Sequence, residues 1–452
     1  MVISAISDYP SVEMTENRVW KCEAGDFTGT ESDGCIRLKG IRYASAERHC
    51  PPVPFIYPEG VHECNTPSPY CFQNEARLEG YLIGIFYKEF PQSEDCLRLS
   101  ITMPSATSPD SKLPVMVWFH GGSYKNGGCE NFVYDRDRLA REQNVIVVGV
   151  NYRLGLFGFV RDRDGNPANN GLLDCIEALR WIKRNIQSLG GDPDRVTIFG
   201  QSSGADICRA VMLSEGTEEL YKRAIIQSPP LGTYENREAM DRMVLEEFNR
   251  CPVDSTPEEI IKVQDTILSH VKVRGNAKQM VFGLHFGVHP LPHSDKIQDR
   301  MREISEGHEI LIGSNTREAI AYVGGVRILR RLSMNPLSRK IVMLIVQRYT
   351  DGIFRNPTKR YAEMYAECGG TVYLYDFFWM DGKSLIGACH GSELSLIFGA
   401  NGLDESRDVN MGLRNDEIND IGIPVRKMWA DFARNGTVDI ESIDGVLKVR
   451  HL

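Results

Sequence analysis

The sequence predicts an α/β fold with a large, mostly parallel sheet flanked by helices. Short β-branched runs alternate with helical patterns, and the runs are almost continuously apolar, as expected of parallel strands covered on both faces. In such folds ligands bind beyond the carboxyl ends of the strands, so the loops that follow the strands are where catalytic residues are expected. The expected strands are 115–119, 145–150, 196–199, 223–227, 309–312 and 371–375.

Other elements fit the same sheet. Residues 170–189 place apolar side chains at helical spacing and end at Gly190 and Gly191, which predicts a helix with a glycine stop. Residues 27–42 and 95–103 alternate in the manner of antiparallel strands and predict a β-rich N-terminal edge on this sheet. Because no repeat, low-complexity run or linker divides the chain, we expect a single domain over residues 1–452.

Composition narrows the class of protein. The 52 Lys and Arg against 61 Asp and Glu give a net charge of −9, and no basic stripe offsets it, which argues against nucleic acid or anionic lipid as the main partner. No apolar run is long enough for a membrane span. The first 18 residues lack the basic and apolar regions of a secretory signal, which predicts a cytoplasmic location. The sequence does not determine the oligomeric state.

A Gly-x-Ser-x-Gly motif follows the expected strand 196–199. It reads Gly200-Gln201-Ser202-Ser203-Gly204 and precedes a helical pattern over 205–213. In a sharp strand–turn–helix connection, glycines two positions either side of a serine leave room for the neighbouring backbone, and the hydroxyl stands exposed above the sheet. The helix N-terminus behind the serine favours developing negative charge. We therefore predict that Ser202 is a nucleophile.

A nucleophilic hydroxyl also needs donors for an oxyanion. The expected strand 115–119 runs into His120-Gly121-Gly122-Ser123-Tyr124, a glycine-rich loop able to present backbone N–H groups. Ser203, the residue after the nucleophile, would contribute another. An ordinary strand-end turn is the alternative interpretation of this loop.

Six further segments occur in one order along the chain: 40–44 (GIRYA), 93–97 (SEDCL), 151–155 (NYRLG), 170–174 (NGLLD), 190–193 (GGDP) and 429–436 (WADFARNG). With the serine motif they resemble the type-B carboxylesterase family, the relatives of acetylcholinesterase, over nearly the whole chain. The resemblance implies an α/β-hydrolase fold. The chain is also shorter than most relatives. Only 72 positions separate Glu318 from His390, the two residues that match the family's acid and base, and this short interval implies a reduced cap region.

The resemblance also implies the partners of Ser202. His390, in the segment 387–393 (GACHGSE), matches the family's general base, and Glu318, in 313–319 (GSNTREA), matches its acid. The order Ser, acid, His agrees with the α/β-hydrolase order. The base would take the serine proton and return it to the leaving alcohol, while the acid fixes the imidazole tautomer.

The oxyanion donors and one supporting residue are assigned in the same way. The resemblance places oxyanion donors at Gly122, Ser123 and Ser203, with Gly121 giving the loop its freedom, and Ser228 matches a hydrogen-bonding serine beside the triad. Three positions depart from the family pattern: Ala319 stands where Gly usually follows the acid, Ser123 where a third loop glycine is usual, and Ser203 where Ala is usual.

Two cysteines match a family disulfide. Cys71 lies 25 positions before Cys96, at the spacing of the family's bridge, but the expected reducing compartment favours free thiols. The pairing is left open here.

Three histidines offer a competing site. His285, His289 and His293 have the spacing of helical metal ligands, but Pro290 and Pro292 break any helix there. Pocket-wall or surface histidines are therefore favoured, and we expect no metal and no cofactor.

The predicted protein is a serine carboxylesterase that acts on a small-molecule ester through an acyl-enzyme. The alternatives are an acyl-transferring or lactone-opening enzyme that uses the same triad, and a non-catalytic binding member of the family.

Overall fold

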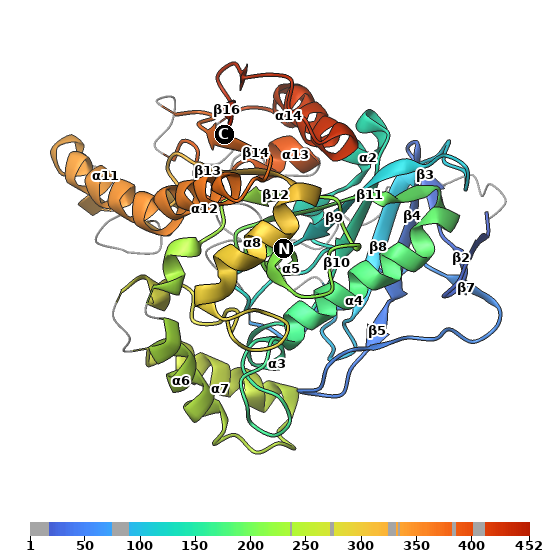
Figure 1. Cartoon of the computed structure of the whole chain (residues 1–452), viewed down its shortest axis with the longest axis horizontal. Helices are drawn as coiled ribbons and strands as arrows, with labels where there is room; N and C mark the ends of the chain where they lie inside the picture. The colour runs from blue at the N-terminus through green and yellow to red at the C-terminus, as the bar shows by residue number, and fades with distance from the viewer. Residues whose placement is uncertain are drawn as a thin grey trace, which may run out of the picture.

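The computed structural model describes residues 18–74, 90–235, 237–271, 275–323, 331–332, 335–381, 386–400 and 412–452. Its main feature is an 11-stranded sheet with the order β15-β16-β14-β13-β12-β11-β9-β10-β8-β4-β3. The six strands from β14 to β10 are mutually parallel, and those at both edges are antiparallel. The predicted large, mostly parallel sheet is therefore confirmed (Figure 1).

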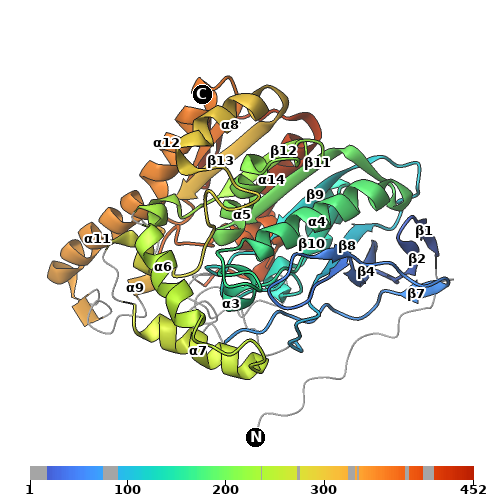
Figure 2. The same cartoon turned by 60° about the horizontal axis from the view of Figure 1, so that its bottom comes forward.

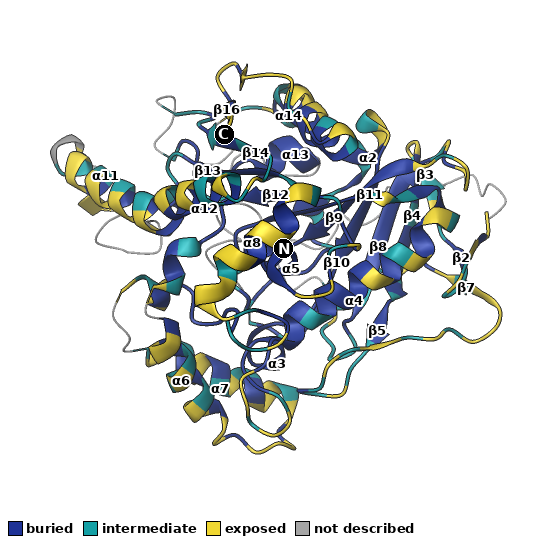
Figure 3. Cartoon of the chain, in the orientation of Figure 1, coloured by how far each residue is buried: buried dark blue, intermediate teal, exposed yellow. Residues whose placement is uncertain are grey.

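The parallel strands coincide with the apolar runs. They are β9 (Leu113–Phe119), β10 (Ile146–Val150), β11 (Gly191–Gln201), β12 (Arg223–Gln227), β13 (Glu309–Asn315) and β14 (Val372–Phe377). Their apolar side chains are buried because helices cover both faces of the sheet (Figure 3).

The N-terminal edge differs in part from the prediction. β4 (Cys35–Arg42) pairs antiparallel with β8 (Arg98–Pro104), as expected, and β3 (Thr30–Ser32) pairs antiparallel with β4. β2 (Gly25–Thr28) instead joins a separate three-stranded sheet with β1 (Trp20–Cys22) and β7 (Val61–Glu63). The expectation that all of 27–42 lies on the main sheet was therefore wrong, because the chain changes sheets between β2 and β3.

Each face of the sheet carries its own core. One core includes residues of α4 (Asn170–Asn185), α5 (Ser203–Leu213), α8 (Ile297–Ile304) and α12 (Asn356–Glu367). The other includes residues of α2 (Asp137–Gln143), α13 (Leu394–Phe398) and α14 (Asn415–Asn435). The predicted helix 170–189 is confirmed: α4 continues into a 3₁₀ turn that Gly190 closes with a φ of 81°.

The remaining elements are peripheral. β15 (Ser442–Ile443) and β16 (Leu447–His451) close one edge, and β5 (Ala44–Ser45) pairs with β6 (Val53–Pro54). Four helices lie along one side of the molecule: the single-turn α3 (Gly155–Gly158) and α9 (Ile320–Val323), and the longer α6 (Arg237–Phe248) and α7 (Pro257–Ser269). Helix α11 (Pro336–Thr350) projects from the body (Figure 2). Among the described helices, none is long and apolar enough to cross a bilayer. The expectation about a secretory signal concerns residues 1–18, of which only Arg18 is described.

Candidate active site

Ser202 occupies a sharp turn between β11 and α5. Its backbone has φ 59° and ψ −126°, a conformation that L-residues rarely adopt and that the surrounding structure must hold in place. A Cβ on Gly200 would lie 2.5 Å from the carbonyl carbon of Gly204, and one on Gly204 would overlap the carbonyl oxygen of Phe119. The glycines are therefore required because three stretches of backbone meet at this turn. The Ser202 N–H donates to the Gln227 carbonyl at 2.9 Å.

Glu318 and His390 are brought together from loops after two adjacent parallel strands, β13 and β14. Nδ1 of His390 lies 2.6 Å from Oε2 of Glu318, and the glutamate is fully buried. The other carboxylate oxygen, Oε1, accepts the Asn315 N–H at 2.6 Å. A carboxylate against Nδ1 favours the tautomer with its proton on Nδ1, which leaves Nε2 as the basic nitrogen.

A residue that the sequence did not single out contacts that basic nitrogen. The amide Nε2 of Gln201 lies 3.1 Å from Nε2 of His390. Within the described part of the chain, Ser202 Oγ makes no hydrogen bond. Gln201 is the first of the two variable residues in the Gly-x-Ser-x-Gly motif, so only the folded turn shows that its side chain reaches the histidine.

The predicted oxyanion loop lies against the serine. A Cβ on Gly121 would lie 3.2 Å from Ser202 Cβ, which places this loop beside the turn. Gly122 and Ser123 both have positive φ, 120° and 55°. The Gly122 carbonyl accepts from Lys125 and Asn126, whereas the N–H groups of Gly122 and Ser123 meet no acceptor among the residues described. The Ser203 N–H lies in the first turn of α5, where N–H groups lack intrahelical partners.

His120 begins this loop and serves as a packing residue. Its ring stacks on Tyr152 with centroids 4.5 Å apart, and the Tyr152 hydroxyl donates to the His120 carbonyl at 2.6 Å. Burial lowers the pKa of His120 to about 4, so the ring is neutral near pH 7. A neutral imidazole fixes the loop without adding charge beside the serine.

A second buried carboxyl lies behind the acid. The Asn315 side-chain amide donates to Glu393 Oε2 at 2.7 Å and to the Cys389 carbonyl at 2.7 Å, so Asn315 links the loop of Glu318 to that of His390. Burial, followed by the negative charge of Glu318, raises the pKa of Glu393 to about 7. Sequence reasoning missed both residues, although Asn315 and Glu393 lie within the quoted segments 313–319 and 387–393.

Two aromatic rings border the histidine. The centroid of Phe354 lies 4.8 Å from that of His390, and the centroid of Tyr322 lies 6.0 Å away. Ser228 follows β12 with a φ of 51° and is fully buried. Its Oγ has no hydrogen-bond partner among the described residues, so the supporting hydrogen bond expected of it stays a prediction.

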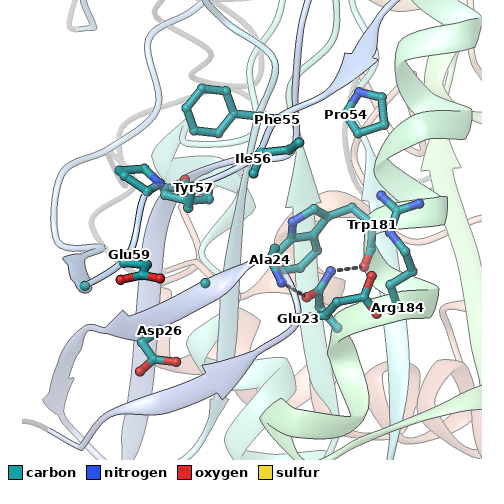
Figure 4. Close-up of a pocket in the computed structure, with 14 residues that line it drawn as sticks. Glu23, Ala24, Asp26, Pro54, Phe55, Ile56, Tyr57, Glu59, Trp181 and Arg184 are labelled. Carbon is teal, nitrogen blue, oxygen red and sulfur yellow. Dashed lines mark hydrogen bonds between the residues drawn. The ribbon is translucent and has the colours of Figure 1, made fainter.

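A cavity of about 620 Å³ lies elsewhere, between the three-stranded sheet and α4 (Figure 4). Trp181, Phe55 and Tyr57 contribute to its wall, and none of the predicted catalytic residues does. The Asn185 side chain accepts from the Ala24 N–H and donates to the Trp181 carbonyl, so this wall is held by ordinary structural contacts.

The competing metal interpretation finds no support in the described residues, where no cluster of His, Cys, Asp and Glu could hold an ion. His285 lies 3.0 Å from the Phe159 carbonyl oxygen and 3.6 Å from Asp241. The twelve cysteines are free thiols. The thiols of Cys71 and Cys96 contact each other, and this hydrogen bond raises the pKa of Cys96.

This arrangement, a serine at a strand-to-helix turn with an acid–histidine pair beyond the neighbouring strands, is that of an α/β-hydrolase. A family profile described as the carboxylesterase family matches residues 16–326 and 333–443. The chain therefore belongs to the carboxylesterase family and is a carboxylic ester hydrolase.

Individual relatives agree with this assignment. A probable N-octanoylanthranilate hydrolase of Rhodococcus erythropolis is 33% identical over 92% of both chains. The para-nitrobenzyl esterase of Bacillus subtilis is 29% identical over 93% of this chain and 90% of its own. Among solved structures, a thermophilic PNB esterase superposes with a TM-score of 0.77 at 26% identity, covering 96% of this chain and 98% of its own.

Proposed function

We propose that the protein hydrolyses small-molecule carboxylic esters by means of a Ser202–His390–Glu318 triad. The Ser202 hydroxyl adds to the ester carbonyl while Nε2 of His390 takes its proton. The N–H groups of Gly122, Ser123 and Ser203 stabilise the oxyanion. His390 then gives the proton to the departing alkoxide, which leaves as the alcohol, and an acyl-enzyme remains on Ser202.

Deacylation repeats these steps with water. His390 takes a proton from water as the hydroxide adds to the acyl carbonyl, and Ser202 recovers its proton as the carboxylic acid leaves. Before each addition, Nε2 of His390 must exchange its contact with Gln201 for one with the attacking oxygen. The imidazolium that forms is stabilised by Glu318.

The observation that carries this proposal is the 2.6 Å contact between Glu318 and His390, together with the strained turn at Ser202. A buried carboxylate–imidazole pair together with a serine in a strained turn fits nucleophilic catalysis better than a structural role, because neither backbone strain nor burial of charge stabilises the fold.

The direct test is covalent labelling with a fluorophosphonate, followed by mass spectrometry of the modified peptide. The label should fall on Ser202, and Ser202→Ala should abolish both labelling and p-nitrophenyl butyrate hydrolysis while leaving the thermal midpoint near that of the wild type. A label on another serine, or full activity of the variant, would contradict the proposal. Ser203→Ala is the matched control and should still be labelled.

Two further questions about the reaction can be tested: which nucleophile accepts the acyl group, and whether amides are cleaved as well as esters. An acyl-enzyme partitions between water and other nucleophiles, so added alcohols test the acyl-transfer alternative by the ratio of ester to acid formed. The relative named for N-octanoylanthranilate suggests that amides of aromatic amines belong to the substrate range. Comparing an N-acyl anilide with the matching phenyl ester would measure this preference, because the amine must be protonated by His390 before it leaves.

A further inference from the structure

Helix α11 carries an apolar face that the described structure leaves uncovered. Its central residues 341–346 read IVMLIV, so over this stretch apolar side chains point in every direction around the helix axis. Val342 and Val346 are buried, but Leu344 is 71% exposed and Ile341 61% exposed. Both α11 as a whole and its exposed surface stand away from the body of the molecule (Figures 2 and 3).

The exposed side of α11 also has a definite geometry. Ile341, Ile345 and Tyr349 recur every four residues and therefore form one row along the helix. The neighbouring exposed row consists of Lys340, Leu344 and Arg348. We call these six residues the α11 face. It combines an apolar strip with a basic residue toward either end.

The charge of this region is opposite to that of the protein. α11 contains Arg339, Lys340 and Arg348 and no acidic residue, whereas the whole chain carries −9. Further along, Arg355 pairs with Asp376, and Lys359 pairs with Glu363. Among the described residues, neither Lys340 nor Arg348 forms an ion pair. The overall negative charge of the chain is thus reversed locally on α11.

The buried side of the same helix contacts the candidate active site. Val342 and Val346 cluster with Ala319, the residue that follows Glu318. At the end of α11, the Thr350 hydroxyl accepts the Ala319 N–H at 3.1 Å. One helix diameter, roughly 10 Å, therefore separates whatever touches the α11 face from the loop that holds the acid.

We propose that the α11 face docks on an anionic lipid surface and brings the active site to lipid-soluble esters. The apolar strip would enter the headgroup region, and Lys340 and Arg348 would meet lipid phosphates, the pattern of helices that lie in a membrane interface. The substrate part of this inference rests on the proposed function, whereas the docking part does not.

A second copy of the chain fits this face less well. A two-fold interface through α11 would set the same rows against each other, so Lys340 and Arg348 would approach the basic residues of the other copy. Like charges facing each other across an apolar contact are destabilising, whereas lipid phosphates neutralise them. Charge complementarity therefore favours the lipid surface.

The first experiment measures binding of the full chain to vesicles by flotation. The Ser202→Ala protein is used, so that loss of catalysis cannot be mistaken for loss of docking. It should float with vesicles containing about one-third phosphatidylglycerol in phosphatidylcholine, and this binding should weaken as salt is added. No binding to these vesicles, or equal binding to pure phosphatidylcholine, would overturn the proposal.

Substitutions on the α11 face test whether it is the surface that binds the vesicles. Lys340→Glu with Arg348→Glu should reduce the partition coefficient by about tenfold or more, and Leu344→Ser should reduce it as well. The matched controls are Lys448→Glu and Ile56→Ser, which change another exposed base and an 86% exposed apolar residue elsewhere. The same substitutions made in the wild-type protein, which keeps Ser202, should leave hydrolysis of soluble p-nitrophenyl acetate at the wild-type rate, which shows that the variants are folded.

Sedimentation velocity tests the alternative that a second copy of the chain covers the α11 face. If the protein is a dimer that Leu344→Ser dissociates, the face is a self-interface and the lipid proposal fails. If the protein binds anionic vesicles but the charge reversals hydrolyse vesicle-embedded p-nitrophenyl palmitate as fast as wild type, docking does not deliver substrate. If Ser202 itself proves not to be the nucleophile, the flotation result is unaffected.

Discussion

The side-chain amide of Gln201 lies 3.1 Å from Nε2 of His390, the ring nitrogen that faces away from Glu318. An amide donates to a neutral imidazole through its nitrogen and, turned over, accepts from an imidazolium through its oxygen. Gln201 therefore suits both protonation states of His390, the base in the proposed mechanism, and places no charge beside either of them.

Adding a charge at this position should move the pH profile. Gln201→Glu places a carboxylate beside Nε2, which stabilises the imidazolium and raises the pKa of His390. Because the neutral imidazole acts as the base, the acid limb of kcat/KM should shift to higher pH, by roughly one unit. The measurement is p-nitrophenyl butyrate hydrolysis from pH 5 to 9.

The neutral isostere Gln201→Met is the control for that shift. It removes the hydrogen bond without adding charge, so its acid limb should stay where the wild-type limb lies. Identical profiles for the Glu and Met variants would show that residue 201 does not sense the charge of His390.

Removing the charge of Glu318 should leave the fold and damage catalysis. Glu318→Gln keeps the size of the side chain, but its amide can hold His390 in the tautomer with the proton on the wrong nitrogen. The expected loss in kcat is roughly 10,000-fold with little change in KM. Retention of more than about a tenth of the wild-type kcat would show that another group serves as the acid.

The turn at Ser202 should not tolerate a methyl group. In Gly204→Ala the new Cβ would overlap the Phe119 carbonyl oxygen in β9, so strand and helix must move apart. We expect the variant to lose about 3 kcal/mol or more of unfolding free energy and most of its activity. Urea unfolding measures this. The control is Gly307→Ala, whose Cβ meets no atom within 4 Å and which should stay within about 0.5 kcal/mol of wild type.

The carboxyl of Glu393 should make stability depend on pH. Burial raises its pKa from 4.5 to about 7, so between these values the folded chain binds more protons than the unfolded chain. The unfolding free energy should therefore fall as pH rises from 5 to 8, by an amount on the order of 3 kcal/mol. Glu393→Gln cannot ionise, and its stability relative to wild type should rise over this interval.

Urea unfolding at pH 5 and pH 8 tests the sign. The exposed Glu367→Gln should follow the wild-type pH dependence, which serves as the control. A Glu393→Gln protein that loses stability relative to wild type between pH 5 and 8 would show that the carboxyl is ionised in the fold.

Local sequence patterns were sufficient to predict most strands of the 11-stranded sheet. The apolar runs identified all six parallel strands, because a strand buried on both faces must be apolar at successive positions. The glycines around Ser202 marked the turn, since only residues without a Cβ fit there. Placement of β2 was wrong because the alternation of a strand shows that one face is buried, and not which sheet it joins.

By itself, the sequence determined the strand series, the sharp turn at Ser202 and, through a family resemblance, the pairing of Glu318 with His390. Only the tertiary structure decided that Gln201 reaches His390, that Asn315 joins two loops to a second buried carboxyl, and that α11 exposes an apolar row on the side opposite to its contact with Ala319. These features depend on distances between segments that are remote along the chain, and burial of a side chain depends on what packs against it. A local sequence pattern determines neither the distance between remote segments nor the burial of a side chain.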